Sequence, residues 1–253
     1  MPKAVSEDTF EAVWIDQSWL FWELFNEGGT LLSRDVANRA YEILQHACDR
    51  LSGTPSEFDR VDTITTLRRA IAQRVRTIKE VYQLSELQLD TKPKRDLELL
   101  AYFGIIRPFM LKRLIDIRNM VEHQGSGVPP IDECLMFADL VWYFLRSTDP
   151  LVRNQGGKLL FEPPGAANAS SESRPEVELN FDGENFSELP DIRAWLDPSS
   201  LSYEQGKNWI KIQNAEVATY VDEESARLWV HGRMCGTEEQ KKLIYDTYFK
   251  RDY

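Results

Sequence analysis

The chain of 253 residues is long enough for one large domain or two small ones, and 42% hydrophobic residues supply a sizeable core. No apolar run reaches the roughly 18 uncharged residues of a membrane-spanning helix, and the charged N-terminal residues do not resemble a secretory signal, so we expect a cytoplasmic protein without membrane contact. The net charge of −11 argues against broad, unspecific nucleic-acid binding.

Charge is unevenly distributed along the chain. Residues 57–123 hold 13 Lys and Arg against 10 Asp and Glu, whereas the segments on either side are net acidic. A modest basic groove is therefore possible in this region, although solvated helix faces would give the same count. Cys48, Cys134 and Cys235 are far apart and include no Cys-x-x-Cys pair, so we expect reduced thiols, no disulfide framework and no zinc site.

Apolar residues follow a helical spacing up to about residue 149. The spacing predicts five helices, at about 8–26, 34–52, 56–84, 95–124 and 130–147. Gly28-Gly29 would end the first helix and Ser56 could begin the third. Gly104 and Pro108 predict a kink within the fourth. Together these elements predict an up-and-down α-helical bundle over residues 1–150.

The composition changes after the helices. Residues 162–175 are rich in Pro, Gly, Ala and Ser, and a linker or long loop is expected over 151–175. Runs of strand character follow at Val177–Phe181, Trp209–Gln213, Val217–Val221 and Leu228–Met234, with Asn214-Ala215 and residues 222–225 as hairpin loops. Thr237 to Gln240 fit a capping box for a C-terminal helix. The predicted fold class is thus mainly α in the N-terminal part, followed by a small β-rich α+β module at 176–253.

One short segment contains the candidate chemistry. In LIDIRNMVEHQG, residues 114–125, Arg118 and Asn119 are followed by His123 with four residues between Arg and His. The segment closes the fourth expected helix, and a Gly/Pro loop and an aromatic helix come next. The pair Arg39 and His46 fits a similar spacing, but it lies in the middle of a helix and lacks a polar residue directly after the Arg.

The residue types in this segment suit RNA cleavage without a metal. Histidine exchanges protons near neutral pH, so His123 could take the proton of a ribose 2′-OH or protonate a leaving oxygen. Arg118 could pair with phosphate oxygens and stabilise a pentavalent transition state, while Asn119 would position the groups. In a regular helix Arg118 is offset by about 140° from His123, so a frayed or 3₁₀ last turn is needed to bring both to one phosphate.

This arrangement resembles the R-x(4–6)-H motif of HEPN-domain ribonucleases, and the resemblance covers about residues 31–149. It implies a HEPN-like bundle and a metal-independent endoribonuclease that needs no cofactor, with Arg118, Asn119 and His123 as catalytic residues. It also implies an RNA substrate and a homodimer formed through the bundle, which places two motifs across a cleft. A role as a toxin or in anti-phage defence is expected from the family alone.

Simpler interpretations remain open. A helix-end His123 is favoured by the helix dipole, and Arg118 with Glu122 would form an ordinary exposed ion pair. The alternative function is a non-catalytic, HEPN-like dimeric interaction or scaffold protein whose acidic C-terminal module binds a protein partner. Trp14, Trp19 and Trp22 would belong to the core or to a partner surface, and His231 is expected to be structural or exposed and not a ligand.

Overall fold

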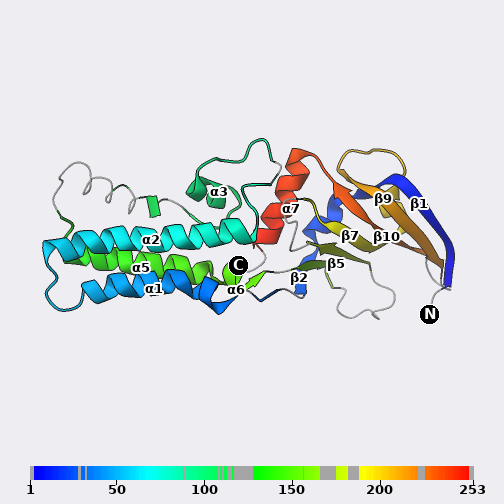
Figure 1. Cartoon of the computed structure of the whole chain (residues 1–253). Coiled ribbons are helices and arrows are strands. Elements are labelled where there is room, and N and C mark those ends of the chain that lie inside the picture. Colours follow the sequence, from blue (N-terminus) through cyan, green and yellow to red (C-terminus); the bar gives the residue numbers. More distant parts are fainter. Residues whose placement is uncertain are drawn as a thin grey trace. The chain divides into compact units, whose positions relative to one another are not determined.

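Two compact units make up the protein in a computed structural model (Figure 1). The structure describes residues 3–27, 30–31, 33–87, 89–107, 109, 111–112, 116, 128–155, 157–165, 175–181, 188–221 and 226–250. Unit 1 comprises Met1–Thr30, Glu86–Asp90 and Gly156–Tyr253, and unit 2 comprises Leu31–Ser85 and Thr91–Gln155. Each unit is therefore assembled from segments that are distant in the sequence.

Unit 1 is built on an antiparallel sheet that has eight strands among the described residues, in the order β2-β5-β6-β7-β10-β9-β1-β8. The strands are β1 (Lys3–Asp16), β2 (Glu23–Glu27), β5 (Lys158–Glu162), β6 (Glu176–Asn180), β7 (Asp191–Leu196), β8 (Leu201–Ser202), β9 (Trp209–Val221) and β10 (Ala226–Cys235). Short 3₁₀ helices lie at Gln17–Phe21 and Pro198–Ser200. The sheet thus takes strands from both ends of the chain.

Alternating side chains give the sheet one buried face and one more open face. In β7 the side chains of Ile192 and Leu196 are buried, whereas Arg193 between them is exposed. The helix α7 (Glu238–Lys250) packs on the buried side, where the ring of Tyr248 lies 4.5 Å from that of Phe181, measured between centroids. Burial of this apolar face is what stabilises the sheet.

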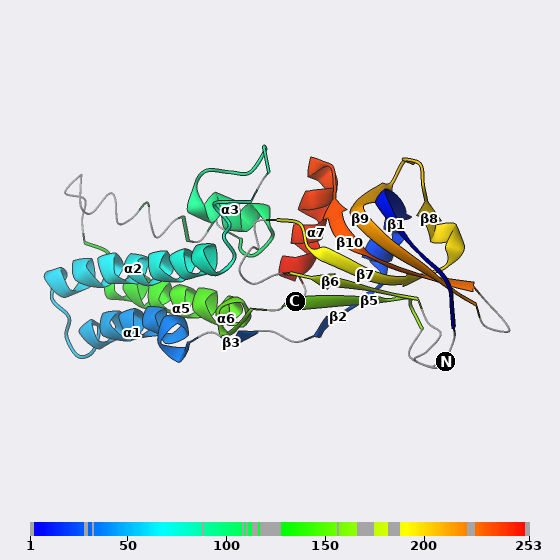
Figure 2. The same cartoon turned by 45° about the vertical axis from the view of Figure 1, so that its right-hand side comes forward.

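Unit 2 consists mainly of helices. These are α1 (Arg34–Arg50), α2 (Glu57–Val81), α3 (Asp96–Tyr102), α5 (Ile131–Ser147) and α6 (Asp149–Arg153), and the short strands β3 (Thr30–Leu31) and β4 (Asn154–Gln155) pair with each other. Figures 1 and 2 show α1, α2 and α5 side by side along their length. The core between them contains Ile64, Leu67, Ile71 and Ile78 of α2.

Hydrogen bonds fix the directions of the three long helices. Arg60 of α2 donates to the carbonyl of Pro129, just before α5, and Arg74 donates to Leu145 near the end of α5. The two helices therefore run parallel. Thr63 donates to the carbonyl of Ala47 near the end of α1, so α1 runs antiparallel to α2.

The prediction of a mainly α-helical bundle over residues 1–150, followed by a small β-rich module, is wrong. Residues 3–16 and 23–27 form β1 and β2 of the eight-stranded sheet, and no helix spans 8–26. Phe10, Val13 and Trp14 fit a helical spacing, but Val13 and Ile15 are both fully buried while Trp14 between them is only half-buried. That is the alternation of a strand, and it is fixed by pairing with β9.

Four other predicted helices are confirmed. They correspond to α1, α2, α5 and the C-terminal α7. Ser56 and Asp59 form a reciprocal capping box at the start of α2, which satisfies backbone donors that the first turn leaves unpaired. Thr237 and Gln240 do the same at α7.

The helix predicted over 95–124 is interrupted early. Its first part, α3, ends at Tyr102, and Gly104 adopts a φ of 70°. The amide of Ile105 donates to the carbonyl of Leu100 and that of Gly104 to Ala101, which is the Schellman arrangement that ends helices. Gly104 therefore terminates a helix where a kink was expected. Residues 109, 111, 112 and 116 are helical again, and the rest of the predicted helix lies outside the described residues.

Two C-terminal predictions also need correction. Asn214-Ala215 is not a hairpin loop, because β9 runs through it as one strand. Asn214 adopts a φ of 49° and the register with β10 shifts between His231 and Arg233, so the extra residue forms a bulge. Residues 158–162, within the segment expected to be a linker, form β5.

We predict that Gly232→Ala destabilises unit 1. A Cβ at residue 232 would lie 2.6 Å from Cγ2 of Ile212 and 2.8 Å from the backbone oxygen of Gln213, opposite the bulge. Relieving this overlap should cost about 1–3 kcal/mol of unfolding free energy, measured by chemical denaturation. Gly157→Ala, where a Cβ meets open space, is the control and should change stability by less than about 0.5 kcal/mol. Equal effects of the two substitutions would contradict the packing described for the bulge.

Candidate functional site

The three residues of the predicted motif, Arg118, Asn119 and His123, lie outside the described residues. The structure therefore gives no geometry for them. The described residues nearest to them in the preceding sequence are Lys112 and Asp116, both exposed. Both residues precede the motif by a few positions in the sequence, and both line a groove of the described part of the chain.

Lys112 and Asp116 line a groove of unit 2 together with one side of α2 and the residues that begin α3. The cavity volume is about 580 Å³, and Ile71 and Val75 of α2 contribute apolar lining. Four cationic side chains line this cavity, and we therefore call it the basic groove: Arg68, Lys94, Arg95 and Lys112. Its composition fits a ligand that combines negative charge with apolar surface.

Three carboxylates line the basic groove against its four cations. Two of them are ion-paired, one with a cation outside the groove and one with Arg95 of the groove itself, while Asp116 forms no ion pair with a described residue. Asp96 forms an ion pair with Lys79 at 2.6 Å, and Glu98 pairs with Arg95 at 3.3 Å. Within the described part of the chain, Arg68, Lys94 and Lys112 have no carboxylate partner. The groove is thus locally positive in a protein whose net charge is −11, and such a site attracts phosphate groups.

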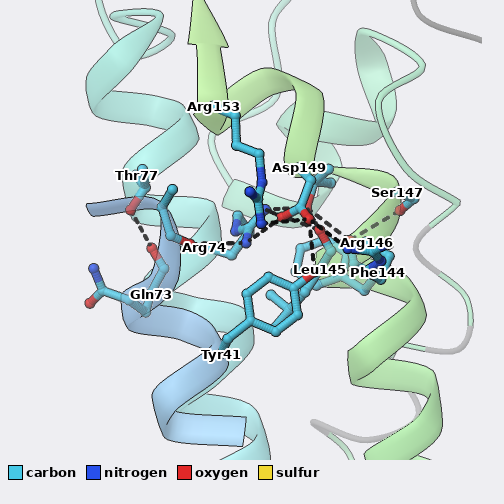
Figure 3. Close-up of polar contacts among 12 residues, drawn as sticks. Tyr41, Gln73, Arg74, Thr77, Phe144, Leu145, Arg146, Ser147, Asp149 and Arg153 are labelled. Atoms are coloured by element: carbon cyan, nitrogen blue, oxygen red, sulfur yellow. Dashed lines mark hydrogen bonds and ion pairs between the residues drawn. The ribbon is translucent and has the colours of Figure 1, made fainter. Parts of the chain in front are cut away.

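A buried ion pair holds the helices of unit 2 together (Figure 3). The Arg74 side chain is 1% exposed, and both its Nη1 and Nη2 donate to Oδ1 of Asp149 at 3.0 Å. The same guanidinium donates to the backbone oxygens of Leu145 and Ala37, at 3.0 and 3.3 Å. One side chain of α2 therefore binds α1, α5 and α6 at once.

The second carboxylate oxygen of Asp149 is also engaged. Oδ2 accepts a hydrogen bond from Tyr41 at 3.0 Å and lies 3.6 Å from Arg146 and 3.4 Å from Arg153. Burial lowers the pKa of Arg74, and its contacts with Asp149 oppose that shift. The pKa of Tyr41 is raised by burial and then by its hydrogen bond to Asp149. Because the groups that meet here are paired with one another, we assign the cluster to holding the helices in their arrangement and not to catalysis.

Sequence reasoning did not identify this cluster, although the sequence contains a signal for it. Arg74 lies on the buried stripe of α2 between Ile71 and Ile78, at the i+3 and i+4 spacing of a helix face. A charge in an apolar stripe predicts a buried partner. The partner, Asp149, is the second residue after the end of α5 and could not be identified from spacing alone.

The remaining sequence candidates divide between core and surface. Trp19 belongs to the core, where its ring packs edge-on against Phe161 with centroids 5.0 Å apart. Trp14 is half-buried and lines a cavity of unit 1. His231 lies on β10, 3.4 Å from Glu216 across the ladder. Cys48, Cys134 and Cys235 are free thiols.

Within the described ranges, His, Cys, Asp and Glu side chains form no group of three or more that could hold a metal ion. The helices described here include none with the length and apolar character to cross a membrane. Comparisons with protein family models, curated proteins and solved structures find no match.

We predict that removing Asp149 costs more stability than removing Arg74. Asp149→Ala leaves a fully buried guanidinium without its carboxylate, which should cost about 3–5 kcal/mol. Arg74→Met leaves Asp149 with Tyr41, Arg146 and Arg153, so the cost should be about 1–3 kcal/mol. Denaturant unfolding of both variants measures the difference.

Arg39→Met serves as the control for this comparison. It breaks the exposed ion pair with Glu42 on α1, in which both side chains are more than half exposed. The change should stay within about 0.5 kcal/mol. If Arg74→Met proved more costly than Asp149→Ala, the two arginines near the surface would not compensate the carboxylate as described.

Proposed function

We propose that this protein is a metal-independent endoribonuclease of HEPN type in which Arg118, Asn119 and His123 carry out the reaction. One observation carries the proposal: the R-N-x-x-x-H motif directly follows, in the sequence, the segment that lines the basic groove. The groove offers Arg68, Lys94 and Lys112 for the phosphates of an RNA strand. The resemblance of residues 31–149 to HEPN domains supports the same chemistry, a cytoplasmic location and a role as a toxin or in anti-phage defence.

The proposed reaction needs only protein side chains. The ribose 2′-oxygen attacks the adjacent phosphorus while His123 accepts the 2′-OH proton, and the bond from phosphorus to the 5′-oxygen breaks. The leaving 5′-oxygen takes a proton from a second acid, which gives a 2′,3′-cyclic phosphate and a 5′-hydroxyl. Arg118 stabilises the charge that develops on the phosphate, and Asn119 positions the reacting groups.

A second copy of the chain fits the need for two proton-transfer groups. One histidine cannot easily act as base and acid in the same step. In a homodimer with facing motifs, one copy would supply the base and the other the acid. This arrangement is carried over from the HEPN resemblance, and the proposed enzyme is accordingly a dimer with an RNA substrate.

We predict that His123→Ala abolishes cleavage of single-stranded RNA in the presence of EDTA while the wild-type protein cleaves. The loss should be at least about 100-fold, as expected for a proton-transfer residue. Product ends are analysed for 2′,3′-cyclic phosphate. His46→Ala is the matched control, since His46 is exposed on α1 and belongs to the other Arg–His pair. Cleavage by His123→Ala at the wild-type rate would refute the assignment.

We predict that Lys112→Met weakens RNA binding to the basic groove without changing the chemical step. Loss of one phosphate contact should raise KM and reduce the slope of log affinity against log salt by about 0.7, as for single strands. Lys158→Met on β5 of unit 1 is the control and should leave both values unchanged. A fall in kcat with unchanged KM would place Lys112 outside the binding groove.

The alternative function, a non-catalytic interaction protein, is favoured by the more open face of the sheet in unit 1. The rings of Trp195 and Tyr220 lie 4.9 Å apart on this face, and Trp229 pairs with Trp195 across the ladder. Arg193, two residues from Trp195 on β7, and Arg233, four residues from Trp229 on β10, are about half exposed on the same face. Trp, Tyr and Arg are enriched at the centres of protein interfaces, so this face suits a protein partner. Wild-type protein that cuts no RNA would favour this function.

A further inference from the structure

Unit 1 contains a cavity that the proposed ribonuclease chemistry does not use. It lies among β1, the residues that lead into β9, the end of β10 and the start of α7, and its volume is about 610 Å³. We call it the tryptophan pocket, and its defining residues are Trp14, Trp209, Lys207, Lys211, Cys235 and Gln240. The volume is in the range that small-molecule sites occupy.

The walls of the tryptophan pocket are held in place by packing and backbone hydrogen bonds. A Cβ at Gly206 would lie 2.5 Å from Cδ1 of Trp209, so the indole rests directly on the glycine backbone. The carbonyl of Asn208, a residue with a φ of 65°, accepts from the Gln17 amide at 3.0 Å. Gln240 donates to the carbonyl of Trp209 at 3.1 Å. Because these wall residues are already fixed, binding of a ligand would not require the free-energy cost of ordering them.

The pocket combines aromatic rings with positive charge. The Lys211 ammonium lies 6.0 Å from the centre of the Trp14 ring, within reach of a cation–π contact. Cys235 lies on the wall beside Lys211; burial raises the pKa of its thiol, and the positive charge of Lys211 opposes that shift. Lys207 adds a further exposed ammonium group, while Glu239 is the sole carboxylate on the described wall.

These features select one class of ligand. A neutral aromatic molecule would use the indoles but not the ammonium groups, and a simple anion would use only the latter. A nucleotide uses both, because its flat base stacks on an indole and its phosphate pairs with lysine. We propose that the tryptophan pocket binds a nucleotide, with the base against Trp14 or Trp209 and the phosphate near Lys207 and Lys211. The proposal concerns unit 1 alone and does not depend on ribonuclease activity.

Isothermal titration calorimetry of the full chain tests the proposal, with AMP, GMP, CMP and UMP as ligands and with adenosine and inorganic phosphate as partial ligands. At least one mononucleotide should bind more tightly than both partial ligands. Trp14→Ala should weaken its binding at least about fivefold through lost stacking. Lys211→Met should weaken it about tenfold, because the phosphate loses a charged partner.

Trp142→Ala is the matched control. Trp142 is a 44% exposed tryptophan of α5 in unit 2 whose ring also has a cation over it, with Arg146 at 5.6 Å. This variant should bind the nucleotide as the wild type does. Lys211→Met keeps the test decisive if Trp14→Ala fails to fold, since Lys211 is only half-buried.

A short single-stranded RNA, titrated with its 2′-hydroxyls methylated to prevent cleavage, distinguishes the source of the nucleotide. If a mononucleotide binds, the ligand of the pocket is a free nucleotide. If only the oligonucleotide binds, the ligand is a nucleotide within an RNA strand. Lys211→Met should weaken binding in either case. If neither binds, or if Trp14→Ala and Lys211→Met both bind as tightly as Trp142→Ala, the proposal is wrong. Loss of cleavage in His123→Ala has no bearing on this result.

Discussion

The pairing of β1 with β9 is the interaction on which the rest of the fold depends. Residues 3–16 form a ladder with residues 209–221, so strands from both ends of the chain lie next to each other in one sheet. Once this pairing exists, the helical segments Leu31–Ser85 and Thr91–Gln155 must be an insertion between strands of unit 1. Long-range pairing of this kind closes a large loop, and its stability has to come from the apolar face that the sheet buries.

The inserted helices of unit 2 are held together by a different kind of interaction. Their central contact is polar: Arg74 pairs with Asp149 in the core and also donates to the backbone oxygens of Ala37 in α1 and Leu145 in α5. A buried ion pair stabilises less than apolar packing of the same volume, because both charges lose their hydration. It does, however, demand one geometry, and it fixes where α1, α5 and α6 meet α2. We infer that this pair sets the arrangement of the unit more than it adds to its stability.

Elements that depend on neighbouring residues could be predicted from the sequence, whereas elements that depend on pairing with a distant segment could not. The start of α2 at Ser56, the capping box at Thr237 and the apolar stripe of α2 depend on neighbours within a few residues, and these features were predicted correctly. The apolar residues from Phe10 to Ile15 partly match the period of a helix and partly that of a strand. Pairing with β9, about 200 residues further along the chain, is what makes this segment a strand. Gly104 and Asn214 were recognised as breaks, yet whether a break gives a kink, a terminus or a bulge depends on the hydrogen bonds around it.

The two candidate sites differ in whether they can be predicted from the sequence. Arg118 and His123 form a motif because four residues separate them, whereas the tryptophan pocket joins Trp14 to Lys211 and Gln240, which share no spacing in the sequence. Both proposed sites nevertheless follow from one electrostatic constraint. In a chain of net charge −11, most of the surface repels phosphate, so an anionic ligand accumulates only where cations outnumber their carboxylate partners. The basic groove and the tryptophan pocket are two such places. An acidic protein with few positive sites would therefore bind RNA or nucleotides through a small number of contacts, with a shallow salt dependence and little unspecific binding.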